Sequence, residues 1–237
     1  MKTHDVVILI LILIGGVFVF TRSLSAPASV PREAAKQKTE DFVPAGWSVI
    51  AKAEGDLNGD GVTDTVLAIE DTKTGEADFH PRSLLILLQN KTGDYELSIR
   101  SDTVIPHANE GGIFGDPFSG ISIEKGSVAI DAYGGSAWRW SYSYQFRYQN
   151  AGWYLIGQTS GEFFNGDECM YKTTSQNFLT KRKQEIVSSR WDDYTRTSDI
   201  NEDLPCTEKE TWSSLENKEL LNLKDFGVDD PFSNSSE

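Results

Sequence analysis

The chain has 237 residues and a formal net charge of -14, from 22 Lys and Arg against 36 Asp and Glu. This acidity argues against a nucleic-acid partner, because phosphate binding needs a basic face. The length fits one globular domain with appendages and excludes a large multidomain enzyme, while 38% hydrophobic and 11% aromatic residues are enough for a buried core.

The N-terminus carries an uncharged apolar run over residues 6–20, VVILILILIGGVFVF. Its length matches the longest signal-peptide h-regions, about 15 residues, and falls short of the about 20 that a membrane-spanning helix needs. We therefore expect residues 1–28 to be a signal peptide or an uncleaved signal anchor, followed by a flexible linker over residues 29–41. The domain is then extracytoplasmic, either periplasmic or secreted, or anchored in the inner membrane by residues 6–20. The membrane is contacted only through this segment.

From residue 42 onward the polarity of the side chains alternates with a period of two, and turn-forming residues separate the runs. Strands are expected at residues 48–53, 63–70, 83–89, 95–101, 121–124, 128–133, 139–148, 153–160, 170–179 and 184–190. The pattern predicts an all-β domain over residues 42–226, an antiparallel meander arranged as a sandwich or as small propeller-like sheets. Around Glu210–Leu223 the pattern allows either a short helix or a final strand. Residues 227–237 are expected to form a disordered acidic tail.

The sharpest motif is the loop at residues 55–64, which reads GDLNGDGVTD. Its oxygen donors occupy alternate positions and Gly61 follows the third, as in D-x-[DN]-x-[DN]-G loops. Calcium takes 6 to 8 oxygen ligands, and alternate positions of a tight loop converge on one centre. We expect Gly61 to supply the positive φ of the reversal. The predicted Ca²⁺ ligands are the side chains of Asp56, Asn58, Asp60 and Asp64 and the carbonyl of Val62.

The residues around this loop distinguish it from an EF-hand. Leu67 stands where an EF-hand has its bidentate Glu, and the segments on both sides alternate as strands do. The loop with its flanking strands resembles the calcium loop of FG-GAP and VCBS repeats, which build the propellers of integrin α chains and occur in many exported bacterial proteins. The resemblance implies a structural Ca²⁺. The motif occurs once, so a complete propeller, which needs several blades, is not expected.

Residues 138–148 read WRWSYSYQFRY and place every aromatic side chain on one face of a strand. Aromatic residues favour strands and bury large areas, so this face is interpreted as part of the core. The alternative is that Trp138 and Trp140, beside the glycines at 134 and 135, emerge as a platform for a sugar ring or a peptide.

The chain contains two cysteines, Cys169 and Cys206. In an exported protein this number favours one disulfide, which would hold the polar stretch 191–205 against the domain. No CxxC or HExxH motif is present, so the sequence gives no support to zinc or thiol redox chemistry.

Catalytic motifs are scarce. GxSxG is absent, and His80 and His107 each adjoin a proline, which predicts solvated loop histidines. The sequence is therefore interpreted as a non-enzymatic, exported or membrane-tethered binding or structural module of the cell envelope with a structural Ca²⁺ loop. One alternative is a hydrolase that acts on envelope glycan through carboxylates near Glu110–Asp116, within a glycine-rich loop. A further alternative, suggested by the charge, is an inhibitor or partner of a basic envelope enzyme, so an envelope glycan and a cationic protein both remain as partners.

Overall fold

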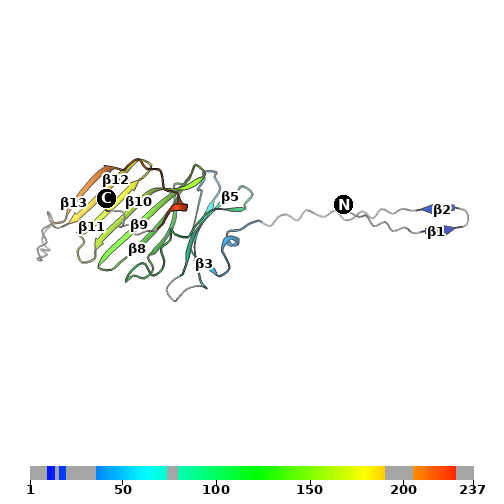
Figure 1. Ribbon diagram of the computed structural model, residues 1–237, viewed down its shortest axis with the longest axis horizontal. Helices are drawn as coiled ribbons and strands as arrows, with labels where there is room; N and C mark the ends of the chain where they lie inside the picture. The colour runs from blue at the N-terminus through cyan, green and yellow to red at the C-terminus, as the bar shows by residue number, and fades with distance from the viewer. Residues whose placement is uncertain (1–9, 14–15, 20–35, 74–79, 190–204, 228–237) are drawn as a thin grey trace. The chain divides into compact units, whose positions relative to one another are not determined.

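The computed structural model describes residues 10–13, 16–19, 36–73, 80–189 and 205–227 (Figure 1). The chain divides into two compact units, Met1–Ala35 and Lys36–Glu237. In the first, β1 (Ile10–Leu13) pairs antiparallel with β2 (Gly16–Val19). Within the described residues no helix is both long and apolar enough to cross a bilayer. Most of the expected signal or anchor segment lies outside the described residues, so the extracytoplasmic location stays a prediction.

The second unit contains two antiparallel sheets. The smaller sheet has the order β3 (Trp47–Gly55), β4 (Asp64–Asp71), β5 (Arg82–Gln89), β6 (Tyr95–Ser101). The larger has seven strands in chain order: β7 (Phe118–Glu124), β8 (Ser127–Gly135), β9 (Trp138–Gln149), β10 (Gly152–Phe164), β11 (Tyr171–Asn177), β12 (Arg182–Ser189) and β13 (Thr207–Ser214). The prediction of an all-β antiparallel meander is confirmed, and because the two sheets share one core the arrangement is a sandwich.

The main hydrophobic core lies between the two sheets. The smaller sheet contributes Val66 and Ile86, and the larger contributes Tyr144, Phe146 and Trp153, each 3% exposed or less. A second cluster, with Leu67 and Leu85, lies on the opposite face of the smaller sheet. Because both of their faces are buried, β4 and β5 have continuous apolar runs instead of strict alternation.

The second cluster is covered in part by the chain that precedes β3. The 3-10 helix η1 (Thr39–Phe42) places Phe42 against it, and Thr39 is buried. The amide of Tyr95 donates to the carbonyl of Gln37 at 3.1 Å. The folded unit therefore begins at Lys36 and includes the end of the segment that was expected to be a linker.

The C-terminal part of the domain is extended. The possibility of a helix around Glu210–Leu223 is wrong, because residues 207–214 pair with β12 and complete the sheet. Beyond β13 the described chain has one short 3-10 helix, η2 (Leu223–Asp225), and it buries Leu223 and Phe226 in the main core. Ladder hydrogen bonds and side-chain docking outweigh the modest helix propensity of this segment.

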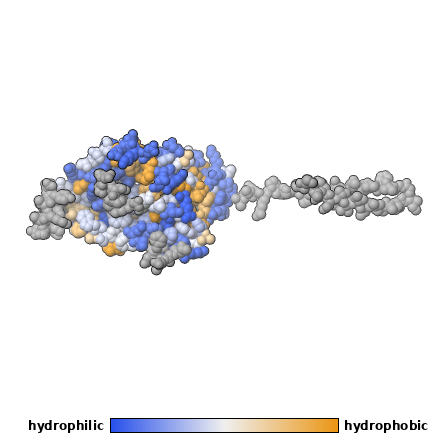
Figure 2. All heavy atoms as spheres, viewed as in Figure 1, coloured by the Kyte–Doolittle hydropathy of each residue, from blue (hydrophilic) through white to orange (hydrophobic). Residues whose placement is uncertain are grey.

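The larger sheet has two halves. We call β7–β10 the covered half, because the main core lies against it, and β11–β13 the open half, because none of its described strand residues is a buried hydrophobic. The inner face carries Tyr142, Tyr144 and Phe146, and the outer face carries Ser141, Ser143 and Gln145, the alternate residues of β9. Hydrophilic residues dominate the side of the folded unit seen in Figure 2.

Candidate functional site

The loop predicted to bind calcium joins β3 to β4, from strand to strand as expected. Gly61 has a φ of +81°, which confirms the predicted reversal, and Gly59 has a φ of +79°. The side chains of Asp56, Asn58 and Asp60 are exposed. The Asp56 carboxylate accepts the amides of Gly59 and Gly61 at 2.8 and 2.9 Å. The loop is thus held in its turn by its own acidic side chains.

Asp64 differs from the other acidic residues of this loop because it is fully buried. One of its oxygens accepts the amide of Leu57 at 2.8 Å and the other that of Gln89 at 2.9 Å. Burial raises the pKa of Asp64, and the nearby charges of Asp60 and Asp56 raise it further, against the lowering effect of the two amides. Asp64 therefore fastens the loop to β5, a role that the spacing of the motif alone does not reveal.

The donor set of the loop has the oxygen chemistry that calcium requires. In the part of the chain that the structure describes, however, no three His, Cys, Asp or Glu side chains form a cluster that could hold a metal. An ion would be held by the exposed oxygens of Asp56, Asn58 and Asp60 with the carbonyl of Val62. Asp64 would contribute through the oxygens that already accept two amides. Calcium binding thus stays a prediction.

The disulfide between Cys169 and Cys206 is present, with a Cα–Cα distance of 5.3 Å. It joins the segment before β11 to the segment before β13 and so spans the open half of the sheet. The stretch that it was expected to hold, residues 191–205, lies almost entirely outside the described residues.

The two tryptophans of the suggested ligand platform have different environments. Trp138 is 52% exposed, and its ring lies 5.3 Å from that of Phe164. Trp140 packs against the main core and stacks on Tyr142 with ring centroids 5.6 Å apart and an interplanar angle of 4°. The aromatic face is therefore core for most of its length, as interpreted, and Trp138 alone of this pair presents a largely open ring.

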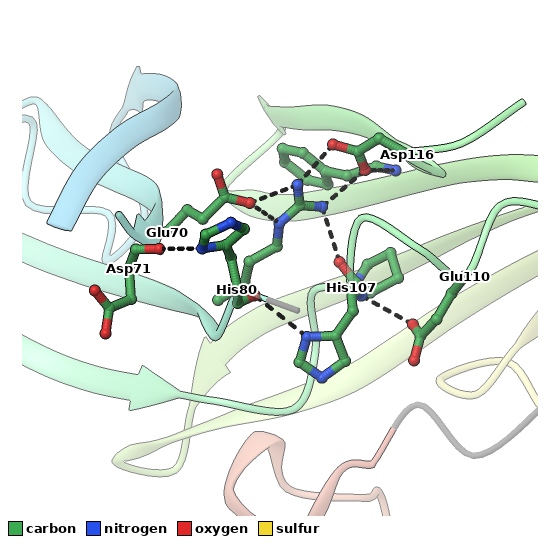
Figure 3. A network of polar contacts seen from close by, with 9 residues as sticks. Glu70, Asp71, His80, His107, Glu110 and Asp116 are labelled. Atoms are coloured by element: carbon green, nitrogen blue, oxygen red, sulfur yellow. Dashed lines mark hydrogen bonds and ion pairs between the residues drawn. The ribbon is translucent and has the colours of Figure 1, made fainter. Parts of the chain in front are cut away.

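The glycine-rich loop that contains Glu110 and Asp116 belongs to a network around Arg82 (Figure 3). Arg82 is 3% exposed and donates to both oxygens of Asp116 at 2.7 and 2.6 Å, to Glu70 at 2.8 Å and to the carbonyl of Pro106 at 3.0 Å. The hydrogen bonds from Arg82 lower the pKa of Asp116. This arrangement stabilises an ionised Asp116 and ties the loop to β5.

The remaining polar groups of this region contact backbone atoms. The Nδ1 atom of His80 lies 2.9 Å from the carbonyl oxygen of Asp71, and the Nδ1 atom of His107 lies 3.4 Å from that of His80. Glu110 accepts the His107 amide at 2.9 Å. Both histidines lie in loops, as expected, and are half-buried, so they are only partly solvated.

A groove on the outer face of the larger sheet was not predicted from the sequence. It has a volume of about 380 Å³ and lies across β9–β13. Its lining consists of Gln145, Gly157, Gln158, Ser175, Gln176, Asn177, Thr180, Arg182, Gln184 and Trp212. The available signal was the row of uncharged polar residues at alternate positions of several strands, together with a tryptophan in the last strand.

The strand register places seven of the ten lining residues in two rows, and Gln158 and Gln176 lie opposite each other at the intervening position. Gln145 lies opposite Gly157, which lies opposite Asn177, which lies opposite Arg182. The neighbouring row runs from Ser143 through Thr159, Ser175 and Gln184 to Trp212.

Comparison of the chain with protein-family models, curated proteins and solved structures gives no match.

Proposed function

We propose that this protein is a non-catalytic, extracytoplasmic β-sandwich that binds a ligand on its larger sheet and whose first hairpin is stabilised by Ca²⁺. The observation that carries this proposal is the groove on the outer face, since its lining residues come from five neighbouring strands and serve no part of the hydrophobic core. The N-terminal apolar run supports the extracytoplasmic location.

The contacts of Asp116, one of the two candidate acids, favour binding over hydrolysis. A glycosidase needs one carboxyl group that can donate a proton and a second that faces the cleaved bond. Asp116 instead accepts two hydrogen bonds from Arg82 and one from the Phe118 amide, and its pKa is lowered. A carboxyl group held ionised in this way is a poor proton donor.

The catalytic alternative is tested by incubating the full chain with soluble neutral glycans and measuring new reducing ends. We expect none above the level of a heat-denatured sample. If the protein released reducing ends and the Glu110→Gln variant did not, the non-catalytic proposal would be overturned and the hydrolase supported.

The calcium part of the proposal predicts a difference between thermal melts in calcium and in chelator. At a hundredfold excess of calcium over its Kd, binding to the folded state alone stabilises by about 2.7 kcal/mol. For a domain of this size that corresponds to a rise in Tm of about 5 to 10 °C. Asp56→Ala and Asp60→Ala should abolish the rise, because each removes exposed oxygen ligands.

Asp94→Asn is the matched control for these variants, since Asp94 belongs to the turn between β5 and β6 and should leave the calcium response intact. Asp64→Asn should lower Tm with and without calcium, because the Asp64 carboxylate binds two backbone amides in either case. Equal melts of the unaltered protein in calcium and in chelator would remove the calcium site from the proposal.

A further inference from the structure

We infer that the groove on the outer face of β9–β13 binds a neutral glycan chain. This inference rests on the proposed binding function and specifies its site and its class of ligand. The volume of about 380 Å³ lies in the lower part of the range found for small-molecule sites, which fits a short run of sugar rings. The row from Ser143 to Trp212 crosses five strands, a span of roughly 19 Å, so the ligand would lie across the strands.

The floor of the groove is low because Gly157 has no side chain. A Cβ atom at this position would lie 3.1 Å from Oε1 of Gln145, so any larger residue would crowd the groove as well as its neighbour. A register shift between Leu155 and Gly157 places this glycine, and next Thr159, on the outer face. The bulge therefore aligns small and polar residues of β10 with Ser175 and Asn177 of β11.

The lining has the hydrogen-bonding chemistry of sugar recognition. Amide side chains such as Gln145 and Asn177 offer both donors and acceptors, and the hydroxyl of Ser175 can act as either. Sugar hydroxyls have the same dual character. The guanidinium of Arg182 adds a planar donor that can contact two neighbouring oxygens.

Trp212 provides an apolar surface at one end of the groove and is 52% exposed. The guanidinium of Arg182 lies 4.3 Å from its ring centroid. Its Nε1–H donates to Oε1 of Glu210, which also accepts from Nε2 of Gln184 at 2.9 Å. These contacts hold the indole in place before a ligand arrives, which reduces the ordering cost of binding.

Charge distinguishes a neutral glycan from an acidic one. Ion pairs of the open half, Lys172–Glu185 and Lys183–Glu185 at 3.2 Å, involve residues whose positions alternate with those of Arg182 and Gln184 and therefore lie on the inner face. The groove lining contains one formal charge, that of Arg182, and the Glu210 carboxylate that accepts hydrogen bonds from Gln184 and Trp212 offsets it. Because the whole chain has a net charge of -14, a polyanionic glycan would be repelled at long range, whereas a neutral glycan would not.

The test is isothermal titration of the full chain with maltotetraose, cellotetraose, chitotetraose and, as the acidic probe, tetragalacturonate. At least one neutral probe should bind, and Trp212→Ala and Gln184→Ala should each weaken binding about tenfold or more, the effect of losing one stacking or hydrogen-bonding contact. Trp138→Ala is the matched control, since Trp138 has the same exposure of 52%, and it should bind as the unaltered protein does.

Several outcomes would overturn the inference: no binding of any neutral probe, binding of tetragalacturonate alone, or binding lost in Trp138→Ala and kept in Trp212→Ala. These results are separable from failure of the proposed function. New reducing ends in the same mixtures would show catalysis and refute the non-catalytic role even if Trp212 is needed for binding. Unchanged melts of Trp212→Ala and Gln184→Ala establish that lost binding does not come from unfolding.

Discussion

The covered and open halves of the larger sheet share one continuous hydrogen-bonded ladder but differ in what stabilises them. In the covered half, side chains such as Phe146 and Ile130 are fully buried against the smaller sheet. Across the described strands of the open half no hydrophobic side chain is buried, and β13 is exposed along its whole length. The difference separates two tasks, since one half provides the free energy of folding and the other presents side chains to solvent.

The open half compensates for its missing core with covalent and backbone connections. The Cys169–Cys206 disulfide joins the segments before β11 and β13, which are separated by 37 positions. In the chain-entropy account, closing such a loop stabilises the folded state by roughly 4 kcal/mol. After β13, the amide of Leu215 donates to the carbonyl of Lys181, which ties the chain to the turn between β11 and β12. A sheet extension fastened in this way keeps its shape while its outer face stays open.

The largest expected effect tests this division directly. Phe146→Ala should lower the free energy of unfolding by about 3 to 5 kcal/mol, because it removes a fully buried ring from the main core. Val187→Ala, in the open half, should cost less than about 1 kcal/mol, because Val187 is 38% exposed. Both values come from chemical denaturation followed by fluorescence. Similar costs for the two variants would show that the open half has a hydrophobic core of its own.

The strands were predictable because their signal is local. Alternation of polarity and turns such as Asn150–Ala151 identify each strand from neighbouring residues, and the two residues of that turn have φ values of 49° and 57°, as right-twisted hairpins require. The reversal at Gly61 was predictable for the same reason. Aromatic alternation also identified the core face of β9, since Tyr142, Tyr144 and Phe146 are all buried.

The features that were missed depend on residues far apart in the chain. Arg82 and Asp116 are separated by 34 positions, and no local pattern indicates that they pair. The groove requires the register of several strands and the bulge before Gly157, which determines which residues of β10 face outward. The segment 207–214 became a strand because β12 offers it a partner edge, a tertiary effect that its charged composition does not indicate.

A smaller effect on stability is expected from two carboxylates, Asp116 and Glu185, whose pKa values are both lowered. For Asp116, in the network around Arg82, the main cause of the lowered pKa is hydrogen bonding from the buried Arg82. For Glu185, in the open half, burial raises the pKa, but hydrogen bonds from Lys172 and Lys183 outweigh it. A carboxyl group whose pKa is lowered by folding stabilises the folded state at pH values above its unfolded pKa, which is about 4. This contribution is lost as the pH falls through the pKa of the folded state.

Urea unfolding between pH 7 and pH 3 should therefore show that Asp116→Asn is less stable than the unaltered protein at neutral pH and that the difference shrinks below about pH 4. Glu185→Gln should follow the unaltered protein more closely at every pH. The side chains of its partners Lys172 and Lys183 are 48% and 34% exposed, so water screens both ion pairs. If Glu185→Gln changed the acid response as much as Asp116→Asn, the ion pairs of the open half would contribute to stability as the buried network does. The open half would then be held by its charges as well as by its disulfide.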